Sequence, residues 1–328
     1  MSDVCVIVAA FNASSTICAA VDSALAQERV AVEVIAVDDA STDGTLRQLE
    51  NVAAADRRLK VLSNTRNAGP AAARNRALEA TRARYVTVLD SDDRMEPGRL
   101  AAMLALAKEG DWDMVADDLH KVTEHGKSAA RTRMFSKHPI GARRIDLEAF
   151  VRGNLTRLHG GRGEMGFFKP LIRRDFLIEN RLGYDESMRL GEDYALYAMA
   201  LAAGASFLLV DPLGYDALTR ADSLSGRHCA ADLGALVAAD RRMGNLPGLS
   251  AAERSALREH EIETQKRWRW LWLIEAVKAR DVSQIAQCMA APPQVIMTIL
   301  GKLVEQAFLR SRGALLSADA GSTRKETR

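Results

Sequence analysis

The sequence predicts an α/β fold in which helices cover both faces of a mostly parallel sheet. Short apolar runs rich in β-branched residues alternate with segments whose apolar residues recur at helical spacing, from residue 4 to about residue 116. Parallel neighbours need crossover connections, so this alternation buries the sheet between helices. Beyond about residue 224 only helical patterns occur, which predicts a C-terminal helical region.

The strands and helices follow one another in a regular order. The predicted strands are residues 4–10, 32–37, 59–62, 85–89 and 114–116. The predicted helices between them cover residues 17–25, 43–49, 70–77 and 97–108. Pro70 favours a helix start, because proline suits the first helical turn. The pattern loosens over residues 119–180, after which we expect a helix over 191–204 and a strand over 206–210.

Composition excludes several classes of protein. The chain has 328 residues, of which 27% are charged, and a formal net charge of +2, so nothing in the overall balance indicates a strongly charged partner. The four cysteines are scattered without a CxxC pair, which fits neither a disulfide framework nor a zinc site. We see no secretory signal pattern, and the longest apolar stretches are shorter than the roughly 20 residues that span a bilayer. We therefore expect a cytoplasmic protein in which any membrane contact is peripheral, on the inner face of the cytoplasmic membrane.

Polar residues follow four of the predicted strands. Asn12 follows the first strand, Asp38 and Asp39 follow the second, residues 67–69 follow the third and residues 90–93 follow the fourth. In open α/β sheets, ligands bind beyond the carboxyl ends of the strands. We expect these groups to converge on one edge of the sheet and to form a ligand site there.

The fourth strand runs into DSDD, which places Asp90, Asp92 and Asp93 together although like charges repel. A divalent ion removes this repulsion, and Mg²⁺ and Mn²⁺ prefer oxygen ligands such as carboxylates and substrate phosphates. The pattern favours a metal–diphosphate site. A plainer interpretation stays open, in which the aspartates cap the next helix, as Asp93 is placed to do. A haloacid-dehalogenase-like phosphatase is disfavoured, because Arg94 stands where that class expects Thr or Val.

Five motifs, in order over about residues 3–220, closely resemble the family 2 glycosyltransferases. They are VIVAAFN (6–12), VIAVDDASTDGT (34–45), N-x-G-x-x-x-ARN (67–75), DSDD (90–93) and GED (191–193). The members of this family are inverting enzymes of the GT-A fold that use a nucleotide-sugar donor. The resemblance thus implies the GT-A form of the α/β fold, a divalent metal (Mg²⁺ or Mn²⁺) and a donor such as a UDP-sugar.

The first two motifs match the part of the family pattern that binds the nucleotide base. By position, Ala10, Phe11 and Asn12 would line the base. Asp39 would accept a hydrogen bond from the uracil N–H, and Asp38 would shape the turn beside it. A second interpretation stays open for Asp38, which is also placed to cap the following helix.

The third motif matches the segment of the family pattern that closes over the uridine and the diphosphate, and in the fourth motif Asp90 would contact the ribose or the sugar. The implied donor contacts are Gly69, Arg74, Asn75, Asp90 and Ser91. Asp92 is the implied metal ligand, with Asp90 as a less certain second. For Arg74 the alternative is an ordinary solvated helix residue.

The fifth motif, at the start of a predicted helix, matches the family's catalytic base. Asp193 is the implied base, and Glu192 is the neighbour most easily confused with it. A general base must be ionised, and the positive end of a helix favours an ionised carboxylate. The alternative is that both acids only cap the helix.

The resemblance implies a single displacement that inverts the anomeric configuration. Asp193 would take the proton of an acceptor hydroxyl, which would attack the sugar opposite UDP, and the ion at Asp92 would neutralise the leaving diphosphate. A further metal or phosphate contact is implied from Ser223, Ser225 or His228. For His228 an ordinary surface position is the plainer interpretation.

We divide the chain at soft boundaries. Residues 1–223 form the predicted catalytic domain, with a donor-binding half over about 1–118 and an acceptor-binding half over about 119–223. Residues 224–312 form the helical C-terminal region. Residues 313–328 are small and polar, which predicts a disordered tail.

The acceptor side is expected to recognise a lipid-linked saccharide. Residues 131–181 contain 12 Lys or Arg and five Asp or Glu, an excess that would attract a diphosphate-linked lipid or an anionic membrane, unless it is an ordinary solvated face. Residues 167–186 resemble the acceptor-side region of bacterial exopolysaccharide glycosyltransferases, particularly those of the succinoglycan type.

Three of the four tryptophans, Trp268, Trp270 and Trp272, alternate with basic residues. This pattern suits a bilayer interface. Alternating positions face different sides of a helix, so at least one Trp should pack in a core. Packing on the catalytic domain, or on a second subunit in a homo-oligomer, stays open as an alternative, and nothing else in the sequence supports nucleic-acid binding.

Two other functions compete with the glycosyltransferase interpretation. A nucleotidyltransferase would normally have a Gly-rich loop with a basic residue after the first strand, whereas residues 9–16 read AAFNASST. A non-catalytic sugar-nucleotide-binding scaffold would tolerate loss of the base, whereas Gly191, Glu192 and Asp193 are all present.

Overall fold

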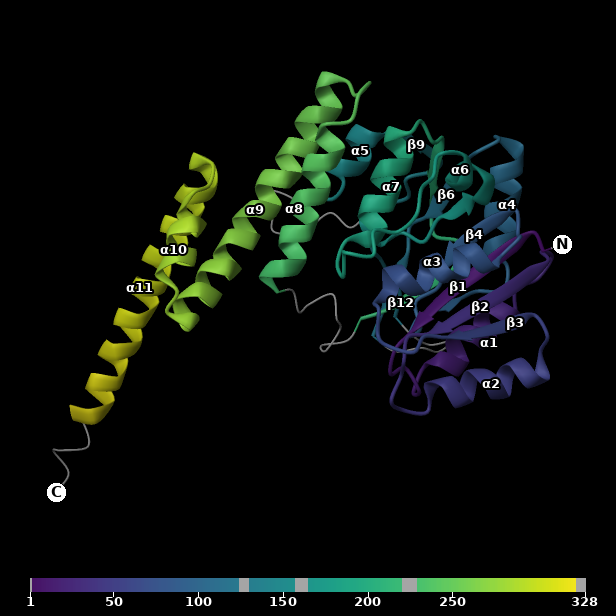
Figure 1. The fold of residues 1–328 in the computed structure, drawn as a ribbon, viewed down its shortest axis with the longest axis horizontal. Coiled ribbons are helices and arrows are strands. Elements are labelled where there is room, and N and C mark those ends of the chain that lie inside the picture. The colour runs from purple at the N-terminus through teal and green to yellow at the C-terminus, as the bar shows by residue number, and fades with distance from the viewer. Residues whose placement is uncertain (1, 124–129, 157–164, 220–228, 323–328) are drawn as a thin grey trace. The chain divides into compact units, whose positions relative to one another are not determined.

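The computed structural model describes residues 2–123, 130–156, 165–219 and 229–322. The chain forms two compact units (Figure 1). We call residues 1–228 with 238–260 the sheet unit, and residues 229–237 with 261–328 the helical unit. The sheet unit contains the catalytic domain predicted for residues 1–223 and also takes in residues 238–260, which our division assigns to the C-terminal region.

The sheet unit is built on an eight-stranded, mostly parallel sheet. In spatial order its strands are β3 (Leu59–Ser63), β2 (Val32–Asp38), β1 (Val4–Ala10), β4 (Tyr85–Val88), β10 (Leu171–Arg173), β6 (Met114–Asp117), β11 (Phe207–Val210) and β9 (Arg143–Ile145). Strand β10 is antiparallel to β4 and β6, and β9 is antiparallel to β11, whereas the other neighbours pair in parallel. The predicted fold class is therefore confirmed.

Helices cover the two faces of the parallel part of the sheet. They include α1 (Ile17–Leu25), α2 (Thr45–Ala55), α3 (Pro70–Ala80) and α4 (Arg99–Glu109). The chain steps from β1 to β2 to β3 and then returns to β4 beside β1. Because such crossovers are right-handed, α1 and α2 cover one face and α3 covers the other (Figure 1).

The loosely patterned stretch contains short elements that periodicity could not reveal. They are β7 (His120–Val122), β8 (Thr132–Arg133), β9, α5 (Leu147–Arg152), the 3₁₀ turn Met165–Phe167, β10 and α6 (Arg174–Glu179). After them come α7 (Glu192–Ala202), β11 and β12 (Tyr215–Leu218), and β5 (Arg94–Met95), β12, β7 and β8 form a second, four-stranded sheet. Strands of two to four residues are too short to show an alternating pattern.

A buried ion pair ties together the middle of the sheet unit. The Nη2 of Arg99, on α4, donates to Asp117 Oδ1 at 2.7 Å and to the carbonyl of Lys169 at 2.7 Å. Neither Arg99 nor Asp117 has any exposed side-chain surface. The second oxygen of Asp117 accepts from the backbone N–H of Leu213 at 2.8 Å. This pair therefore links α4 and β6 to the segments that precede β10 and β12.

A second ion pair lies at the opposite end of β10. Asp113 accepts from the backbone N–H and hydroxyl of Ser206, both at 2.9 Å, and pairs with Arg173. Burial alone would raise the pKa of Asp113, but the hydrogen bonds from Ser206 and the charge of Arg173 outweigh it and lower that pKa. Asp113 thus joins β6, β10 and β11 most strongly as a carboxylate.

The C-terminal helices are α8 (Ala230–Gly244), α9 (Ala251–Ala279), α10 (Val282–Met289) and α11 (Pro293–Ser322). Helix α11 continues past Gly313, where composition predicts the start of a tail. The helical unit has a small core of its own, formed by Leu273, Cys288, Val295 and Ile299. All four cysteines of the chain lie within described residues and are unpaired thiols. None of the helices in the described part of the chain is long and apolar enough to cross a membrane.

The tryptophan cluster is packed within the helical unit. The rings of Trp268 and Trp272 stack with centroids 5.5 Å apart, and the guanidinium of Arg269 lies 4.6 and 5.0 Å from the two ring centroids. Trp270 packs against the small core and lies under Lys302. The expectation that at least one of these tryptophans packs in a core is confirmed, and Arg269 and Lys302 make cation–π contacts with the rings.

We predict that Asp113→Asn lowers stability in a pH-dependent way. At pH 7 the variant should lose about 1–2 kcal/mol, because a charge-assisted network is weakened. The native pKa of Asp113 is lowered, so its contribution is complete above the unfolded value of about 3.9 and disappears as pH falls through the native value. Urea unfolding followed by circular dichroism at pH 7 and at pH 3 measures this. A stability gap of equal size at both pH values would contradict the prediction.

We also predict that Arg99→Met costs about 3–5 kcal/mol, because it leaves the Asp117 carboxylate buried without its cation. The double variant Arg99→Met/Asp117→Leu should recover part of this loss, since both charges are then removed. Urea midpoints of the two variants and the wild type provide the comparison. The explanation is wrong if the double variant is less stable than Arg99→Met alone.

Candidate active site

The strand ends predicted to form a ligand site are neighbours in the sheet. Strands β3, β2, β1 and β4 are consecutive and parallel, and the register pairs Ala10 with Asp38 and Asp38 with Ser63. The loops that follow these strands therefore leave the sheet at the same edge, as predicted. The carbonyl of Ala10 accepts from the backbone N–H of Asp39 at 2.8 Å, which joins the first two loops at their start.

Asp39 organises the loop that enters α3. Its carboxylate accepts from Asn64 Nδ2 at 2.7 Å, from the backbone N–H of Ala68 at 2.9 Å and from the backbone N–H of Gly69 at 2.7 Å. The φ angle of Gly69 is 91°, a left-handed value that favours glycine. The structure thus brings the second and third motifs together through Asp39, whose oxygens are engaged by protein donors.

The loops after β1 and β2 are also linked to each other. Asn12, with a φ of 51°, donates its backbone N–H to Ser41 Oγ at 2.9 Å and accepts from the backbone N–H of Thr42 at 2.8 Å. Asp38 is buried and accepts from the backbone N–H of Ser41, while its Oδ1 has no hydrogen-bond partner among the described residues. Beside them Phe11 is 47% exposed, so this edge presents an aromatic ring next to polar groups.

Four charged side chains from distant parts of the sequence form a closed ring of alternating sign. This charge ring consists of Arg74, Asp90, Lys169 and Asp193. Arg74 contacts Asp90 at 3.1 Å through Nη2 and Asp193 at 3.1 Å through Nη1. Lys169 Nζ lies 3.1 Å from Asp90 Oδ2 and 3.0 Å from Asp193 Oδ2. The ring therefore joins the end of β4 to the first turn of α7 through two cations.

Glu192 joins the charge ring from its edge, with Oε1 2.7 Å from Arg74 Nη1. Gly191, at φ 75°, precedes it and starts α7 in a conformation that favours glycine. Both acids lie in the first turn of α7 and contact buried cations, so the interpretation in which they only cap the helix is wrong.

The pKa values in the ring follow from burial and charge acting in opposite directions. Burial alone would raise the pKa of Asp90, but the charges of Lys169 and Arg74 outweigh it and lower that pKa. Burial alone would lower the pKa of Lys169, but Asp193 and Asp90 outweigh it and raise that pKa. For Glu192 burial is the largest influence, and it raises the pKa despite the charge of Arg74. Lys169 thus stays protonated and Asp90 stays ionised.

Asp93 has a structural role that differs from helix capping. Its carboxylate accepts from the hydroxyl of Tyr215 and the backbone N–H of Leu218, both at 2.8 Å, and the N-cap of α4 is Gly98. The capping interpretation for Asp93 is therefore wrong. Burial, reinforced by the charge of Asp90, raises the pKa of Asp93 to about 8. The Tyr215 hydroxyl also accepts from the backbone N–H of Asp90, which fixes the start of the DSDD turn on β12.

Within DSDD, Asp92 has different surroundings from the carboxylates of Asp90 and Asp93. Both oxygens of Asp90 already contact cations, and Asp93 is buried among protein donors. Ser91 and Asp92 lie in the turn between them with partly exposed side chains. The described residues contain no group of three or more His, Cys, Asp or Glu side chains placed to hold a metal ion, so donor phosphate oxygens would have to complete its coordination. Ser223, Ser225 and His228 lie outside the described residues.

Two predicted donor-binding residues of α3 make other contacts. Arg74 is 5% exposed, so its interpretation as a solvated helix residue is wrong. Asn75 donates from Nδ2 to the carbonyl of Tyr184 and to Glu186, and its Oδ1 accepts from the backbone N–H of Tyr184. Asn75 therefore holds the segment before α7 against α3. The ring of Tyr184 lies 5.3 Å from the guanidinium of Arg74.

Helix α7 is held from the side by a buried polar trio within the sheet unit. Tyr194, the residue after Asp193, donates its hydroxyl to Asp240 at 2.9 Å. Asp240 also contacts His260 Nδ1 at 2.8 Å, and the His260 ring stacks on Tyr194 with centroids 4.4 Å apart. Residues 238–260 thus support the turn that carries the candidate base.

The sequence did not reveal Lys169, Tyr184 or Tyr215 as parts of the site. Lys169 lies in the FFKP segment, which we noted only for its resemblance to an acceptor-side region. A single lysine before a proline belongs to no periodic pattern or motif that would indicate a site. An exposed surface lysine was the ordinary expectation, since lysine is rarely buried unless it is paired.

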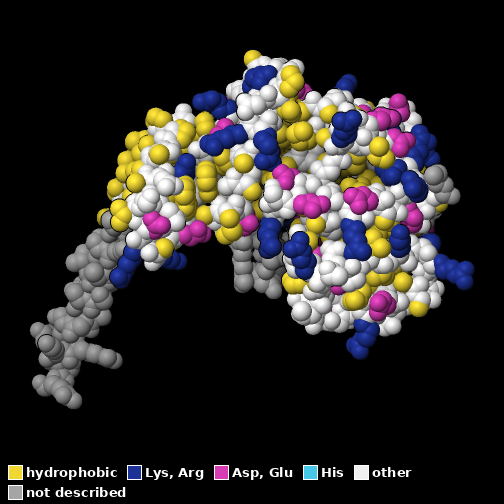
Figure 2. All heavy atoms as spheres, in the orientation of Figure 1, with side chains coloured by type: hydrophobic (Ala, Val, Ile, Leu, Met, Phe, Trp, Pro, Cys, Tyr) yellow, Lys and Arg dark blue, Asp and Glu magenta, His cyan; other side chains and the backbone are white. Residues whose placement is uncertain are grey.

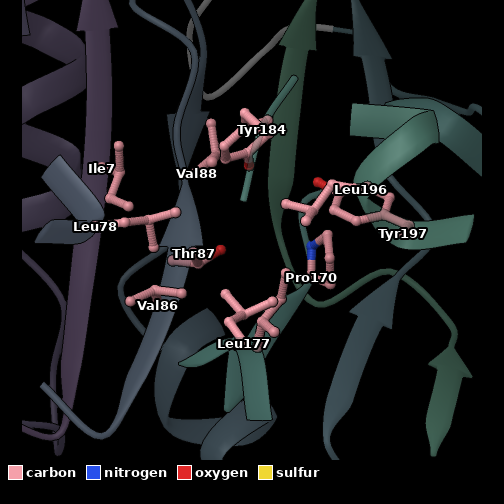
Figure 3. A pocket seen from close by; sticks show the side chains of 11 residues that line it. Ile7, Leu78, Val86, Thr87, Val88, Pro170, Leu177, Tyr184, Leu196 and Tyr197 are labelled. Carbon is pink, nitrogen blue, oxygen red and sulfur yellow. The ribbon is translucent and has the colours of Figure 1, made fainter. Parts of the chain in front are cut away.

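An apolar pocket lies between the sheet and α7, and its walls are core side chains (Figure 3). The residues that line it are Ile7, Leu78, Val86, Thr87, Val88, Pro170, Ile172, Leu177, Tyr184, Leu196 and Tyr197. No charged side chain lines it. A nucleotide diphosphate needs polar and charged partners, so this pocket does not suit the donor, and we place the candidate site at the charge ring and the adjoining strand ends.

Two related proteins align with this chain over most of its length. The succinoglycan biosynthesis protein ExoU of Rhizobium meliloti (strain 1021) is 38% identical over 311 residues, covering 95% of this chain and 90% of ExoU. ExoO of the same organism, also a succinoglycan biosynthesis protein, is 34% identical over 292 residues, covering 89% of this chain and 82% of ExoO.

Solved structures with low sequence identity share the fold. Residues 1–349 of S. aureus TarS in complex with UDP-GlcNAc align with a TM-score of 0.64 at 20% identity, covering 86% of this chain and 89% of that one. The mannosyltransferase PcManGT from Pyrobaculum calidifontis, in complex with GDP-Man and Mn²⁺, aligns with a TM-score of 0.57 at 17% identity, covering 94% of this chain and 86% of that one. The family model described as Glycosyl transferase family 2 matches residues 5–177. The chain therefore belongs to glycosyltransferase family 2 and has the GT-A fold.

Proposed function

We propose that this glycosyltransferase is an inverting, metal-dependent enzyme that moves a sugar from a UDP-sugar to a hydroxyl of a lipid-linked or exopolysaccharide oligosaccharide. The charge ring is the main observation that supports this proposal. Asp193, the candidate base, shares both of its cations with Asp90 at the end of β4. A proton acceptor and a donor-side carboxylate thus belong to one site, as a direct transfer between two bound substrates requires.

The donor would lie along the edge formed by β1, β2 and β4. The exposed ring of Phe11 offers a stacking surface for a base, whereas Asp38 is buried and its Oδ1 has no partner among the described residues, which suits a role in shaping the turn. Asp39 accepts from Asn64, Ala68 and Gly69, and because a carboxylate can accept about four hydrogen bonds, the uracil N–H would be a further donor to it. The structures bound to UDP-GlcNAc and GDP-Man share only the fold with this chain, so the choice of uridine rests on the family resemblance at Asp39.

In the transfer, Asp193 would accept the proton of the acceptor hydroxyl as that oxygen attacks the anomeric carbon opposite the diphosphate. Asp193 is 8% exposed, and its contacts with Arg74 and Lys169 hold it in one place. Glu192 is the alternative base. It forms an ion pair with Arg74 at 2.7 Å, whereas Asp193 forms ion pairs with both cations of the charge ring. A divalent ion at Asp92 would supply neutralisation of the charge that develops on the leaving diphosphate.

The acceptor is proposed from two relatives that align over most of this chain, ExoU and ExoO, which are named for succinoglycan biosynthesis. The basic excess over residues 131–181 gives less support than the sequence indicated, since Arg131, Arg133, Arg152 and Arg173 all pair with carboxylates. Figure 2 shows basic and acidic side chains interspersed on the visible face. We keep acceptor recognition in the predicted acceptor-binding half, residues 119–223. We also propose a cytoplasmic enzyme that binds a lipid-linked substrate at the inner face of the membrane.

Family membership removes the nucleotidyltransferase alternative. The scaffold alternative predicts binding of a nucleotide sugar without turnover. The buried network around Asp193 argues against the scaffold alternative. Burying charged groups costs desolvation free energy, and a protein that only binds a nucleotide sugar does not need a buried base.

The proposal is tested by UDP release from a panel of UDP-sugars, with GDP-mannose as a comparison donor, in the presence of Mn²⁺ or Mg²⁺. Asp193→Asn should lower turnover on the order of 10²–10⁴-fold, the usual contribution of a general base. Asp92→Ala and a chelator should each abolish release, and Mn²⁺ should restore the chelated wild type but not the variant.

Asp175→Asn is the matched control, because Asp175 is exposed in the first turn of α6, where a carboxylate also meets a helix N-terminus. It should keep wild-type turnover. Wild-type turnover in Asp193→Asn would contradict the base assignment. Full activity in the chelator would contradict metal dependence, and GDP-mannose turnover without UDP-sugar turnover would contradict the uridine donor.

A further inference from the structure

Lys169 closes the charge ring but belongs to none of the five motifs. Its side chain is 4% exposed, and its ammonium bridges Asp90 and Asp193 at 3.1 and 3.0 Å. It therefore touches both the donor-side carboxylate and the candidate base, and nothing in the family resemblance assigned it a role.

The backbone around Lys169 is fixed from three elements. Its carbonyl accepts from Arg99 of α4 at 2.7 Å and from the hydroxyl of Thr87 of β4 at 3.4 Å. The carbonyl of Phe168 accepts from the hydroxyl of Tyr197 of α7 at 3.1 Å, and Pro170 restricts the backbone on the other side. Lysine has a flexible stem, so anchoring of this kind lowers the entropy lost in holding its ammonium at one point.

We propose that Lys169 is a positioning residue for sugar transfer, which holds the Asp193 carboxylate at a fixed place relative to Asp90. This inference rests on the proposed function, in which Asp193 is the base. Lys169 acts through Asp193 and does not itself take part in the proton transfer.

Charge balance explains why one cation would not be enough. Arg74 and Lys169 together face three carboxylates, those of Asp90, Glu192 and Asp193. Without Lys169, Arg74 alone would serve all three, and Oδ2 of Asp193 would lose its ion-pair contact. Like charges in a poorly solvated site repel, so the Asp193 carboxylate would rotate away from its place beside Asp90. This movement removes a positioned base.

The local surroundings offer no substitute for the lost cation. Among the residues that the structure describes, Tyr184 and Tyr197 also couple electrostatically to Asp193, and both are buried phenols without positive charge. A misplacement of about 1 Å at a reacting group costs on the order of 10²-fold in rate. The loss of Lys169 should therefore lower turnover much more than donor binding, since Asp90 keeps its contact with Arg74.

The test compares Lys169→Met, Lys169→Gln and Lys169→Arg in UDP release from the UDP-sugar that the wild type uses. We expect Lys169→Met and Lys169→Gln to lower kcat on the order of 100-fold, with KM for the donor changed by less than about threefold. Lys169→Arg keeps the charge and should retain more activity than either. Lys169→Gln keeps hydrogen-bond donors in a side chain of similar shape, so it tests the charge even if the Met variant fails to fold.

Arg173→Met is the matched control, because Arg173 is a cation in an ion pair at the far end of β10, the strand that follows Lys169. It should lose stability in urea but keep wild-type kcat. If Arg173→Met and Lys169→Gln lower kcat equally, or if Lys169→Gln changes only KM, the positioning role is refuted.

A double-mutant cycle separates this proposal from the proposed function. Because Lys169 acts through Asp193, adding Lys169→Gln to Asp193→Asn should cause little further loss of kcat. A further loss as large as that of Lys169→Gln in the wild type would show that the two residues act independently. If Asp193→Asn is slow and Lys169→Gln is not, only the Lys169 proposal fails. If Asp193→Asn has wild-type activity, the base assignment fails and the role of Lys169 through it is overturned as well.

Discussion

Two buried cations hold together carboxylates that would otherwise repel one another, and the candidate site depends on this balance. Arg74 comes from α3 and Lys169 from the segment before β10, while Asp90 follows β4 and Asp193 begins α7. Moving any one of these ions out of water without a partner costs several kcal/mol. The four segments therefore stay together because each charge has an opposite charge within about hydrogen-bonding distance.

Other contacts in the sheet unit hold the segments that carry the charge ring. The buried pair of Arg99 and Asp117 holds the carbonyl of Lys169, and Asp93 and Tyr215 fix the DSDD turn on β12. On α7, the contacts of Tyr194 with residues 238–260 support the turn that presents Asp193. The last set explains why part of the C-terminal helical sequence belongs to the same compact unit as the sheet.

Much of the fold and part of the site could be predicted from the sequence. The first four strands and the helices between them are long enough for their apolar periodicity to show, and each was found close to its predicted place. Asp90, Arg74, Glu192 and Asp193 were selected from three separate motifs, and the structure brings them into direct contact. Asp39 and Asn75 were also selected, yet their described contacts are with loops of the protein itself. The short strands between residues 119 and 191 gave no usable pattern.

Local sequence determined what each segment could become, because apolar spacing sets strand or helix and glycine at positions 69 and 191 permits the left-handed turns that begin α3 and α7. Family motifs then indicated which polar groups belong to one site. Only the tertiary structure decided which charges neutralise which. Lys169 and Asp193 are distant in sequence from Arg74 and Asp90, so no local pattern records their pairing. That pairing is set by the antiparallel insertion of β10 beside β4, which brings an otherwise unremarked lysine to the base.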